Sequence, residues 1–391
     1  MNKFIQNHPP VTSHNEKKFV KECLERNEIA VYGEYLGKFK KKISDITKSK
    51  YVNLVSSGTS AIHLCLIASG VSLKNEVLVP SFTFIGSCSP ILHLKAKPIF
   101  FDVDNFHNID EEKLVKFLKN NTKMKNNICI NKKTKNHIKA IIVVHMWGNA
   151  AKIEKIILEC KKRNISVIED AAEALGTKYI EGKYKGLFAG TIGDFGCLSF
   201  NSNKIITSAG GGAVLSKNIQ NYKLIESLKD HGRKKLGYSH DQVGYNYNLS
   251  NIHASIGYAQ SIIINKKLKF KRNLRKKYLK LFNKSKIFEI VPTPSYSSNN
   301  CWLNVLKIKK KKINADNLIY FFLKEKVEIR KVWKPCHNQP FMKKFLKYEV
   351  KNTNKLYEKY VCLPSGFNIN ASIYQKITKA FIKYENMSDH Q

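Results

Sequence analysis

The run Cys197-Leu-Ser-Phe-Asn-Ser-Asn-Lys204-Ile-Ile-Thr-Ser-Ala-Gly-Gly-Gly212 places one amine among a hydroxyl, small residues and glycines. Its apolar start predicts a strand near 196–200, so Lys204 follows a strand end. An amine there is a candidate nucleophile for a carbonyl group, Ser199 could hold a phosphate, and the glycines let the backbone approach a ligand closely. Taken alone, the run predicts either the anchor of an aldehyde cofactor or one more solvated lysine in a chain with 68 lysines and arginines.

A second segment, Val167-Ile-Glu-Asp-Ala-Ala-Glu-Ala-Leu-Gly-Thr177, delivers two acids at the end of an apolar strand. Small residues follow Glu169 and Asp170, and they would allow a flat group to lie close. A buried carboxylate at this place can keep the ring nitrogen of a pyridine cofactor protonated, which makes the ring an electron sink. In isolation, Asp170 is equally typical of a helix N-cap.

A third segment, 51–70, reads as an apolar strand, a turn of Gly, Ser and Thr, and a helix that Gly70 closes. Gly58, Thr59 and Ser60 would present amides and hydroxyls at the helix N-terminus, which suits a phosphate. Many α/β proteins share this pattern, so it supports the cofactor only together with the other two segments. His63, in the helix, is interpreted as a packing residue.

Length and composition predict a large folded α/β protein. The chain has 391 residues, of which 43% are hydrophobic, so it can bury a large core. We expect strands near 76–80, 98–103, 140–145, 165–169, 196–200 and 213–215, alternating with helices. This alternation predicts a doubly wound, mostly parallel sheet with ligands outside the carboxyl ends of its strands. The predicted domains are 14–255, which carries this sheet, and a smaller α+β domain over 256–391.

The formal charge of +38 raises a different hypothesis, a protein that binds nucleic acid or an anionic membrane. The charges are spread along the chain, however, and no nucleic-acid-binding motif is present. The densest run, Lys266–Lys280, sets Leu274, Tyr278, Leu281 and Phe282 at helical spacing, which favours an amphipathic helix packed on the body over a nucleic-acid helix.

Cysteine and histidine usage predicts no metal site and a reducing compartment. The nine cysteines are scattered and include no Cys-x-x-Cys pair, which is typical of free thiols in a cytoplasm. The histidines lack metal-ligand spacing. The chain shows no signal-peptide pattern and no stretch that could span a bilayer, so we expect a cytoplasmic protein without membrane or specific nucleic-acid partners.

Taken in order, these segments and their neighbours resemble the sugar-nucleotide aminotransferases of the DegT/DnrJ type, a group of fold-type I pyridoxal phosphate enzymes. The resemblance runs from about His14 to about Ile382. It is carried by Val79-Pro-Ser-Phe-Thr-Phe84, Val143-Val-His-Met-Trp-Gly148, Glu169-Asp-Ala-Ala172, Leu198-Ser-Phe-Asn-Ser-Asn-Lys204, Gly244-Tyr-Asn-Tyr-Asn-Leu-Ser-Asn251 and Arg330-Lys-Val-Trp-Lys-Pro335.

The resemblance implies a role for individual residues. Lys204 matches the lysine that binds pyridoxal phosphate and acts as general acid and base, and Asp170 matches the partner of the pyridine nitrogen. The remaining cofactor positions that it implies are Gly58, Thr59, Ser60, Phe84, Glu173, Ser199 and, reaching the neighbouring subunit of a homodimer with shared sites, Asn246 or Asn248. Implied substrate contacts are Trp333, Lys334 and His337.

Two positions depart from the family pattern. Many members have glycine and an acid where this chain reads Ala209-Gly210, and many have arginine where it has Asn248. The first departure keeps the backbone role. The second puts the detail of the cross-subunit contact in doubt.

The implied reaction moves an amino group from an amino acid, by resemblance glutamate, to a keto-sugar attached to a nucleotide. The run 198–207 and the extra segment Asn126–Lys135 look most like enzymes of legionaminic-acid-type pathways, which aminate a UDP-linked 4-keto-6-deoxy-N-acetylhexosamine. GDP-perosamine synthases share Trp333-Lys-Pro and His337-Asn-Gln-Pro340 and are the alternative. Some relatives with histidine in place of the lysine are sugar dehydratases, so Lys204 favours amine transfer.

Overall fold

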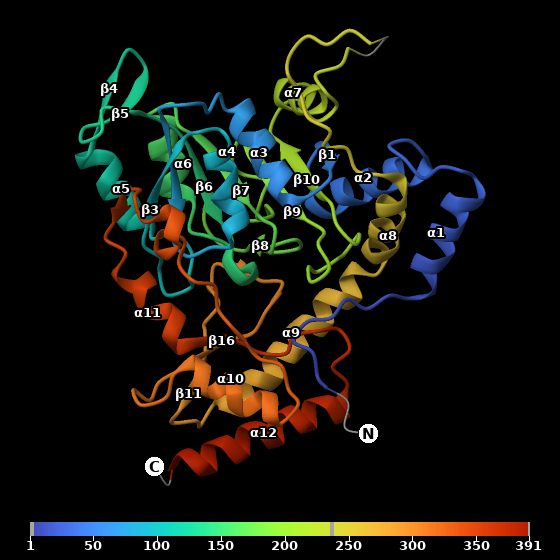
Figure 1. The fold of residues 1–391 in the computed structure, drawn as a ribbon, viewed down its shortest axis with the longest axis vertical. Helices are drawn as coiled ribbons and strands as arrows, with labels where there is room; N and C mark the ends of the chain where they lie inside the picture. The colour runs from blue at the N-terminus through green and yellow to red at the C-terminus, as the bar shows by residue number, and fades with distance from the viewer. Residues whose placement is uncertain (1–3, 235–237, 390–391) are drawn as a thin grey trace.

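The computed structural model describes residues 4–234 and 238–389, which form a large lobe and a smaller one joined by the long helix α9 (Figure 1). The large lobe contains a sheet with the strand order β1-β10-β9-β7-β6-β2-β3-β15. Neighbours from β9 to β15 pair in parallel, whereas β10 is antiparallel to both β1 and β9. These strands are β1 Tyr51–Val55, β2 Asn75–Pro80, β3 Lys97–Phe101, β6 His137–Val144, β7 Ser166–Asp170, β9 Phe195–Ser199, β10 Gly212–Ser216 and β15 Lys347–Tyr348.

Every strand predicted for the sheet is present, with ends shifted by a few residues, and the predicted mostly parallel sheet is confirmed. The central strands are almost continuously buried because helices cover the sheet, which explains their apolar runs. Helix α3 packs across β9, β10 and β7 and against α4 and α7, while α6 packs on β7 and α5. These helices are α3 Gly58–Ala68, α4 Ser89–His93, α5 Glu111–Asn120, α6 Glu154–Lys161 and α7 Ile219–Lys229.

The extra segment at 126–135 forms part of a hairpin. Strand β4 (Thr122–Lys125) pairs with β5 (Ile128–Asn131), and a single pair, Ile130 with His137, attaches the hairpin to β6. The turn residues Asn126 and Asn127 both have positive φ, as a two-residue hairpin turn requires.

The smaller lobe has a hydrophobic core of its own around an antiparallel sheet of order β11-β13-β16-β14. Its elements are α9 Ile264–Phe282, β11 Phe288–Ile290, β13 Val305–Ile308, α10 Ala315–Lys324, β14 Arg330–Lys331, β16 Tyr360–Cys362 and α12 Ala371–Asp389. The remaining helices are α1 His14–Glu25, α2 Glu34–Thr47, α8 Asn251–Ile262 and α11 Lys351–Lys359. Strand β8 (Lys178–Tyr179) pairs with β12 (Ser297–Ser298). Four single-turn segments complete the list: η1 Ile85–Ser87, η2 Met146–Gly148, η3 Cys336–Asn338 and η4 Pro340–Met342.

The chain passes from the large lobe to the smaller one at the junction of α8 and α9. Helix α8 packs on α1 and α2, whereas α9 continues into the second core. At the other end of the chain, Ile5 pairs with Val327 and joins the second core. The boundary predicted between residues 255 and 256 therefore falls within α8, and the division into the domains 14–255 and 256–391 stays a proposal.

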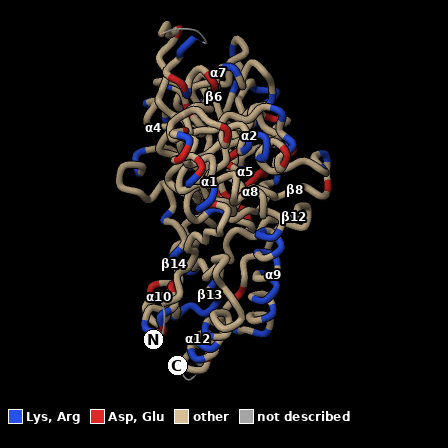
Figure 2. Tube along the Cα trace, turned by 90° about the vertical axis from the view of Figure 1, so that its right-hand side faces the viewer, with Lys and Arg blue, Asp and Glu red and all other residues tan. Residues whose placement is uncertain are grey.

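Helix α9 confirms the predicted amphipathic helix. Leu274, Tyr278 and Phe282 are buried in the second core, and Leu281 packs against it. Lysines and arginines line the rest of the helix (Figure 2). Within residues 4–234 and 238–389, no helix has the length and apolar character needed to cross a membrane.

The sequence did not indicate that cations also lie on the buried side of α9. Lys271 is fully buried, and its amine contacts the carbonyl oxygens of Trp302 (2.9 Å) and Ser365 and the ring of His8. Burial lowers the pKa of Lys271 well below its usual value, and burial together with Lys271 lowers that of His8. The lysine thus joins the N-terminal segment, the helix and two loops through hydrogen bonds.

Replacement of Lys271 by methionine should destabilise the protein. Methionine keeps most of the apolar stem but leaves two buried carbonyl oxygens without a donor, so we expect the free energy of unfolding to fall by about 2 kcal/mol. Urea unfolding measures the change. The matched variant Lys269→Met, at an exposed position of the same helix, should stay within about 0.5 kcal/mol of wild type. Equal stability of the two variants would show that these hydrogen bonds do not hold the segments together.

Candidate active site

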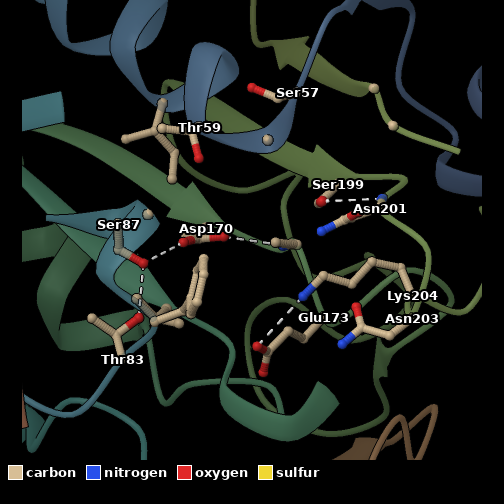
Figure 3. Close-up of a pocket in the computed structure, with 18 of the residues that line it drawn as sticks. Ser57, Thr59, Thr83, Ser87, Asp170, Glu173, Ser199, Asn201, Asn203 and Lys204 are labelled. Atoms are coloured by element: carbon tan, nitrogen blue, oxygen red, sulfur yellow. Dashed lines mark hydrogen bonds and ion pairs between the residues drawn. The ribbon is translucent and has the colours of Figure 1, made fainter. Parts of the chain in front are cut away.

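A cleft of about 300 Å³ opens at the edge of the large sheet where β1, β2, β6, β7 and β9 end. Residues that follow these strands line it, together with the glycines that precede the antiparallel β10 and two tryptophans from beyond α9. This is the edge where open α/β sheets bind ligands. Figure 3 shows the side chains that point into the cleft.

Lys204 lies in the cleft, as predicted. A tight turn, in which Lys204 N–H donates to the carbonyl of Asn201 (3.0 Å), brings it back towards the end of β9. Its Nζ lies 3.6 Å from Oε1 of Glu173 and 4.1 Å from the ring centroid of Trp302, and only 13% of the side chain is exposed. The amine is therefore held between a carboxyl group and an aromatic face, with its tip facing the cleft (Figure 3).

Asp170 is the last residue of β7 and faces the same cleft. Ser87 Oγ donates to its Oδ2 (2.6 Å), and the N–H of Ala172 donates to its Oδ1 (3.1 Å). Thr83 Oγ1 lies 2.7 Å from Ser87 Oγ, so a chain of hydroxyls orients the carboxylate (Figure 3). The contact with Ala172 is the local turn expected of a capping aspartate, but the carboxylate also lines the cleft.

The neighbouring acid, Glu169, points to the opposite side of β7, because side chains alternate along a strand. Its carboxylate is fully buried and accepts hydrogen bonds from His145 Nε2 (2.9 Å) and the N–H groups of Gly190, Ile192 and Gly193. Burial raises the pKa of Glu169, but these donors outweigh it and hold the pKa below its usual range. The ring Nδ1 of His145 accepts from an N–H, so Nε2 carries the proton given to Glu169.

The turn before α3 supplies a candidate phosphate cradle. Ser57 caps the helix and, with Gly58, Thr59 and Ser199, lines the cleft at the helix N-terminus. A Cβ on Gly58 would lie 2.8 Å from the Cβ of Ser199, so only glycine allows this close approach. Exposed N–H groups at a helix N-terminus are typical ligands of a phosphate.

Glu173 stands beside Lys204 with a perturbed acidity. Burial raises the pKa of Glu173 to about 7, although Lys204 and the N–H of Trp147, which donates to Oε2 at 2.8 Å, oppose the shift. This carboxyl group can therefore exchange a proton near neutral pH, next to the amine.

The acidity of Glu173 predicts a pH-dependent stability of the cofactor-free protein. The folded chain binds this proton more tightly than the unfolded chain, so its contribution is complete below about pH 4.5 and is lost as the pH rises through about 7. We expect the free energy of unfolding of wild type, relative to Glu173→Gln, to fall by up to about 3 kcal/mol over this range. Urea unfolding at a series of pH values tests this. A difference that stays flat with pH, like that expected for the exposed control Glu181→Gln, contradicts it.

Phe84 and Trp333 form an aromatic wall in the cleft, and two further tryptophans, which the sequence did not point to as site residues, lie beside it. Trp333, a predicted substrate contact, lines the cleft with Phe84, and the centroids of their rings lie 5.6 Å apart. Trp147 stacks on Trp333 at 4.8 Å. Trp302 was not predicted, yet its indole N–H donates to the carbonyl of Asn203 (2.6 Å), directly before Lys204.

Other functional residues also escaped prediction. Ser87, Asn201 and Asn203 line the cleft. Ser87 follows the Val79–Phe84 motif closely, and Trp302 is one of only three tryptophans in the chain, which are the signals that could have drawn notice.

Three predicted site residues lie outside the cleft lining. Ser60 is the third residue of α3, and its hydroxyl caps the helix by accepting from the N–H of Ser57 (2.9 Å). His337 is buried between Ser81, which contacts Nδ1, and Asn354, which lies 2.8 Å from Nε2. Lys334 is exposed, because its neighbour Trp333 takes the inward position on the extended chain.

The two asparagines predicted to reach a second subunit also lie away from the cleft of their own chain. Asn248 accepts from Lys229 Nζ (2.7 Å) and donates to Asp230 (2.8 Å), and Asn246 pairs with Asp230 through the backbone. Their predicted role across a dimer interface stays a prediction.

Ala209, one of the departures from the family pattern, has a φ of +62°. This left-handed conformation favours glycine, which explains why a glycine suits the position, and alanine adopts it at a cost of about 1 kcal/mol.

The residues present fit pyridoxal phosphate. The cleft combines a lysine, an oriented carboxylate and a helix N-terminus, and the glycine at position 58 lets this helix N-terminus approach Ser199 closely. The cofactor requires an anchoring amine, a carboxylate for its ring nitrogen and a ligand for its phosphate, and groups of these three kinds are present in the cleft. Fold and site together define a fold-type I pyridoxal phosphate enzyme.

The chain belongs to the DegT/DnrJ/EryC1/StrS aminotransferase family, whose model matches residues 10–381. It is 32% identical over 378 residues to EpsN of Bacillus subtilis, which is named as a pyridoxal phosphate-dependent aminotransferase. The alignment covers 94% of this chain and 92% of EpsN. It is 33% identical over 350 residues to the GDP-perosamine synthase of Escherichia coli O157:H7, covering 89% and 90% of the two chains.

Solved structures show the same fold. Helicobacter pylori PseC, an aminotransferase involved in the biosynthesis of pseudoaminic acid, superposes with a TM-score of 0.86 at 22% identity, over 98% of this chain and 100% of PseC. Family membership confirms the predicted activity class, a sugar aminotransferase that depends on pyridoxal phosphate.

Proposed function

We propose that this enzyme transfers an amino group from glutamate to C4 of a nucleotide-linked 4-keto-6-deoxy sugar, as a step in making an amino sugar for a surface glycan. The observation that carries the proposal is the convergence of Lys204 and Asp170 on one cleft beside the aromatic wall of Phe84 and Trp333. Such a wall suits the apolar face of a sugar. A UDP-linked N-acetylhexosamine is our preferred acceptor, and a GDP-linked sugar, the type that a perosamine synthase makes, is the alternative.

The chemistry needs an amine that moves protons and a carboxylate that holds one. Pyridoxal phosphate, when bound, supplies the carbonyl carbon that carries the amino group and the ring that takes up electrons. With the cofactor bound, Lys204 Nζ would take the proton from the α-carbon of the amino-acid donor and deliver it to the cofactor carbon that bears the amino group, and the donor would leave as a 2-keto acid. In the second half-reaction the same amine would move a proton from that carbon to C4 of the sugar, where the keto group is replaced by the amine.

Asp170 and Glu173 set the protonation of the site. The carboxylate of Asp170, oriented by Ser87, holds the proton on the ring nitrogen, and without that charge the ring withdraws electrons poorly. Glu173, 3.6 Å from Lys204 Nζ, exchanges a proton with this amine and so adjusts its protonation.

The first test is the visible spectrum of the protein loaded with pyridoxal phosphate, before and after addition of glutamate. Wild type should show the band of the lysine-bound cofactor, and glutamate should convert it to that of pyridoxamine phosphate, because Lys204 is the attachment point. Lys204→Ala should lose the lysine-bound band, whereas Lys217→Ala, at an exposed position outside the cleft, should keep the full response. A band that no amino acid changes would favour a dehydratase, and the absence of any band would refute the cofactor assignment.

We also propose that the enzyme is a homodimer in which Asn246 or Asn248 completes the phosphate site of the partner. Support comes from the family resemblance and from the distance of both residues from the cleft of their own chain. We also propose a cytoplasmic location, because all nine cysteines are free thiols, as is usual in a reducing compartment.

Mixing two inactive variants tests the shared site. Lys204→Ala and the double variant Asn246→Ala/Asn248→Ala should each be inactive or severely impaired, but a heterodimer of the two holds one site with both wild-type groups. Refolding an equal mixture should therefore restore about a quarter of wild-type activity. If both asparagines served the site of their own chain, no heterodimer would contain an intact site and no activity would return.

A further inference from the structure

A second cleft, of about 540 Å³, lies between the two lobes and shares no lining residue with the cofactor cleft. The loop after β3 lines it from the large lobe, strand β13 from the smaller lobe, and helix α11 from a third side. Its size is in the range of small-molecule sites. Nothing in the proposed reaction uses it.

Four lysines converge on this cleft from two segments. Lys307 lies in β13 and Lys309 directly follows this strand, whereas Lys355 and Lys359 lie one helical turn apart on α11. Lys307 Nζ lies 3.6 Å from Oε2 of Glu289, so this carboxylate balances the charge of Lys307 and not that of the other three lysines. Four lysines spaced like this repel one another, and a polyvalent anion would relieve the repulsion.

Two of these cations are fixed in place by the backbone. Lys359 Nζ donates all three of its N–H groups, to the carbonyl oxygens of Lys310 (3.2 Å), Lys311 (2.8 Å) and Ile313 (2.5 Å), and Lys309 Nζ donates to that of Ser285 (2.5 Å). Lys355 is exposed at the cleft. The charges of Lys309 and Lys359 are thus held at defined positions without being neutralised.

The carboxyl group of Asp104, which also lines the cleft, is turned into its own loop. Its Oδ1 accepts from the N–H groups of Phe106 and Asn108, both at 2.9 Å. Burial raises the pKa of Asp104 to about 7, so its negative charge is reduced near neutral pH. The cleft therefore keeps a net positive charge.

The floor of the cleft is apolar and partly aromatic. Val291, Ile308 and Leu356 are buried there, and the ring of Tyr360 lies against the edge of His107, with ring centroids 5.0 Å apart. A flat ring could lie on this floor while a charged group reaches the lysines. A site with an apolar floor and a cationic rim suits a molecule with the same division.

We propose that this cleft binds a small phosphate ester of the size of a nucleoside diphosphate. Lys309 and Lys355 contact the phosphates, since lysine is a common phosphate ligand, Lys307 and Lys359 add positive charge beside them, and the floor takes the nucleoside. An occupant would lie beside His107, whose Nδ1 accepts from the indole N–H of Trp147 at 3.0 Å. Trp147 stacks on Trp333 of the cofactor cleft, so the second site adjoins the first through two side chains.

Calorimetric titration of the cofactor-loaded enzyme with UDP and, separately, with inorganic pyrophosphate tests the proposal. The cleft variant Lys309→Gln/Lys355→Gln removes two charges at the opening. The control Lys269→Gln/Lys379→Gln removes two exposed charges from α9 and α12, outside the cleft lining, and so matches the change in net charge. Neither pair lines the cofactor cleft, so both variants should retain wild-type kcat.

We expect UDP to bind wild type and the control at a site beyond any at the active centre, and the cleft variant to bind UDP there at least tenfold more weakly. Pyrophosphate should show the same dependence on the two lysines with lower affinity, because it leaves the apolar floor empty. Identical titrations of the cleft variant and the control with both probes would overturn the proposal. So would a loss of binding in both variants, because it would mean that only the overall charge matters.

Discussion

The buried carboxylate of Glu169 is the constraint on which the active centre depends. It accepts a hydrogen bond from His145 and three from the N–H groups of the 190–193 loop, so it fixes the end of β7 against β6 and the approach to β9. A fully buried charge is tolerated only with such a set of donors. Because side chains alternate along a strand, a residue anchored on one side forces its successor, Asp170, to the other side and into the cleft.

The active centre also depends on the smaller lobe, which contributes residues to it. Trp302 comes from the segment that follows α9, yet its indole N–H holds the Asn203 carbonyl and its ring lies under the amine of Lys204. Lys271 in turn holds the carbonyl of Trp302. The position of the Lys204 amine is therefore coupled to the packing of the two lobes, and a movement of one lobe relative to the other would shift Lys204.

The net charge of +38 has no single structural role, but particular lysines and arginines have identifiable ones. On α9, Lys271 and Arg275 are buried and donate to carbonyl oxygens, Lys271 to Trp302 and Arg275 to Val291 (2.7 Å), so part of the basic character serves internal hydrogen bonding. Between the lobes, lysines of β13 and α11 gather around one cleft. Other lysines and arginines occur along α9 (Figure 2), and those outside its buried side, such as the exposed Lys269, give the helix the polar face of an amphipathic helix.

The sequence by itself determined the sheet, because parallel strands buried on both sides must be continuously apolar, and it led to Lys204, Asp170, Thr59 and Ser199 as cleft residues, because each lies at the carboxyl end of a strand or within a few residues of it, at the edge where ligands bind. Ser60 and His337, also expected at the site, lie outside the cleft lining, because Ser60 bonds to Ser57 at the start of the helix and His337 packs against Asn354, and their roles stay predictions. It also missed Trp302, the buried Lys271 and the lysine-lined cleft. These depend on contacts between segments separated by tens to hundreds of residues, and only the tertiary structure brings such segments together.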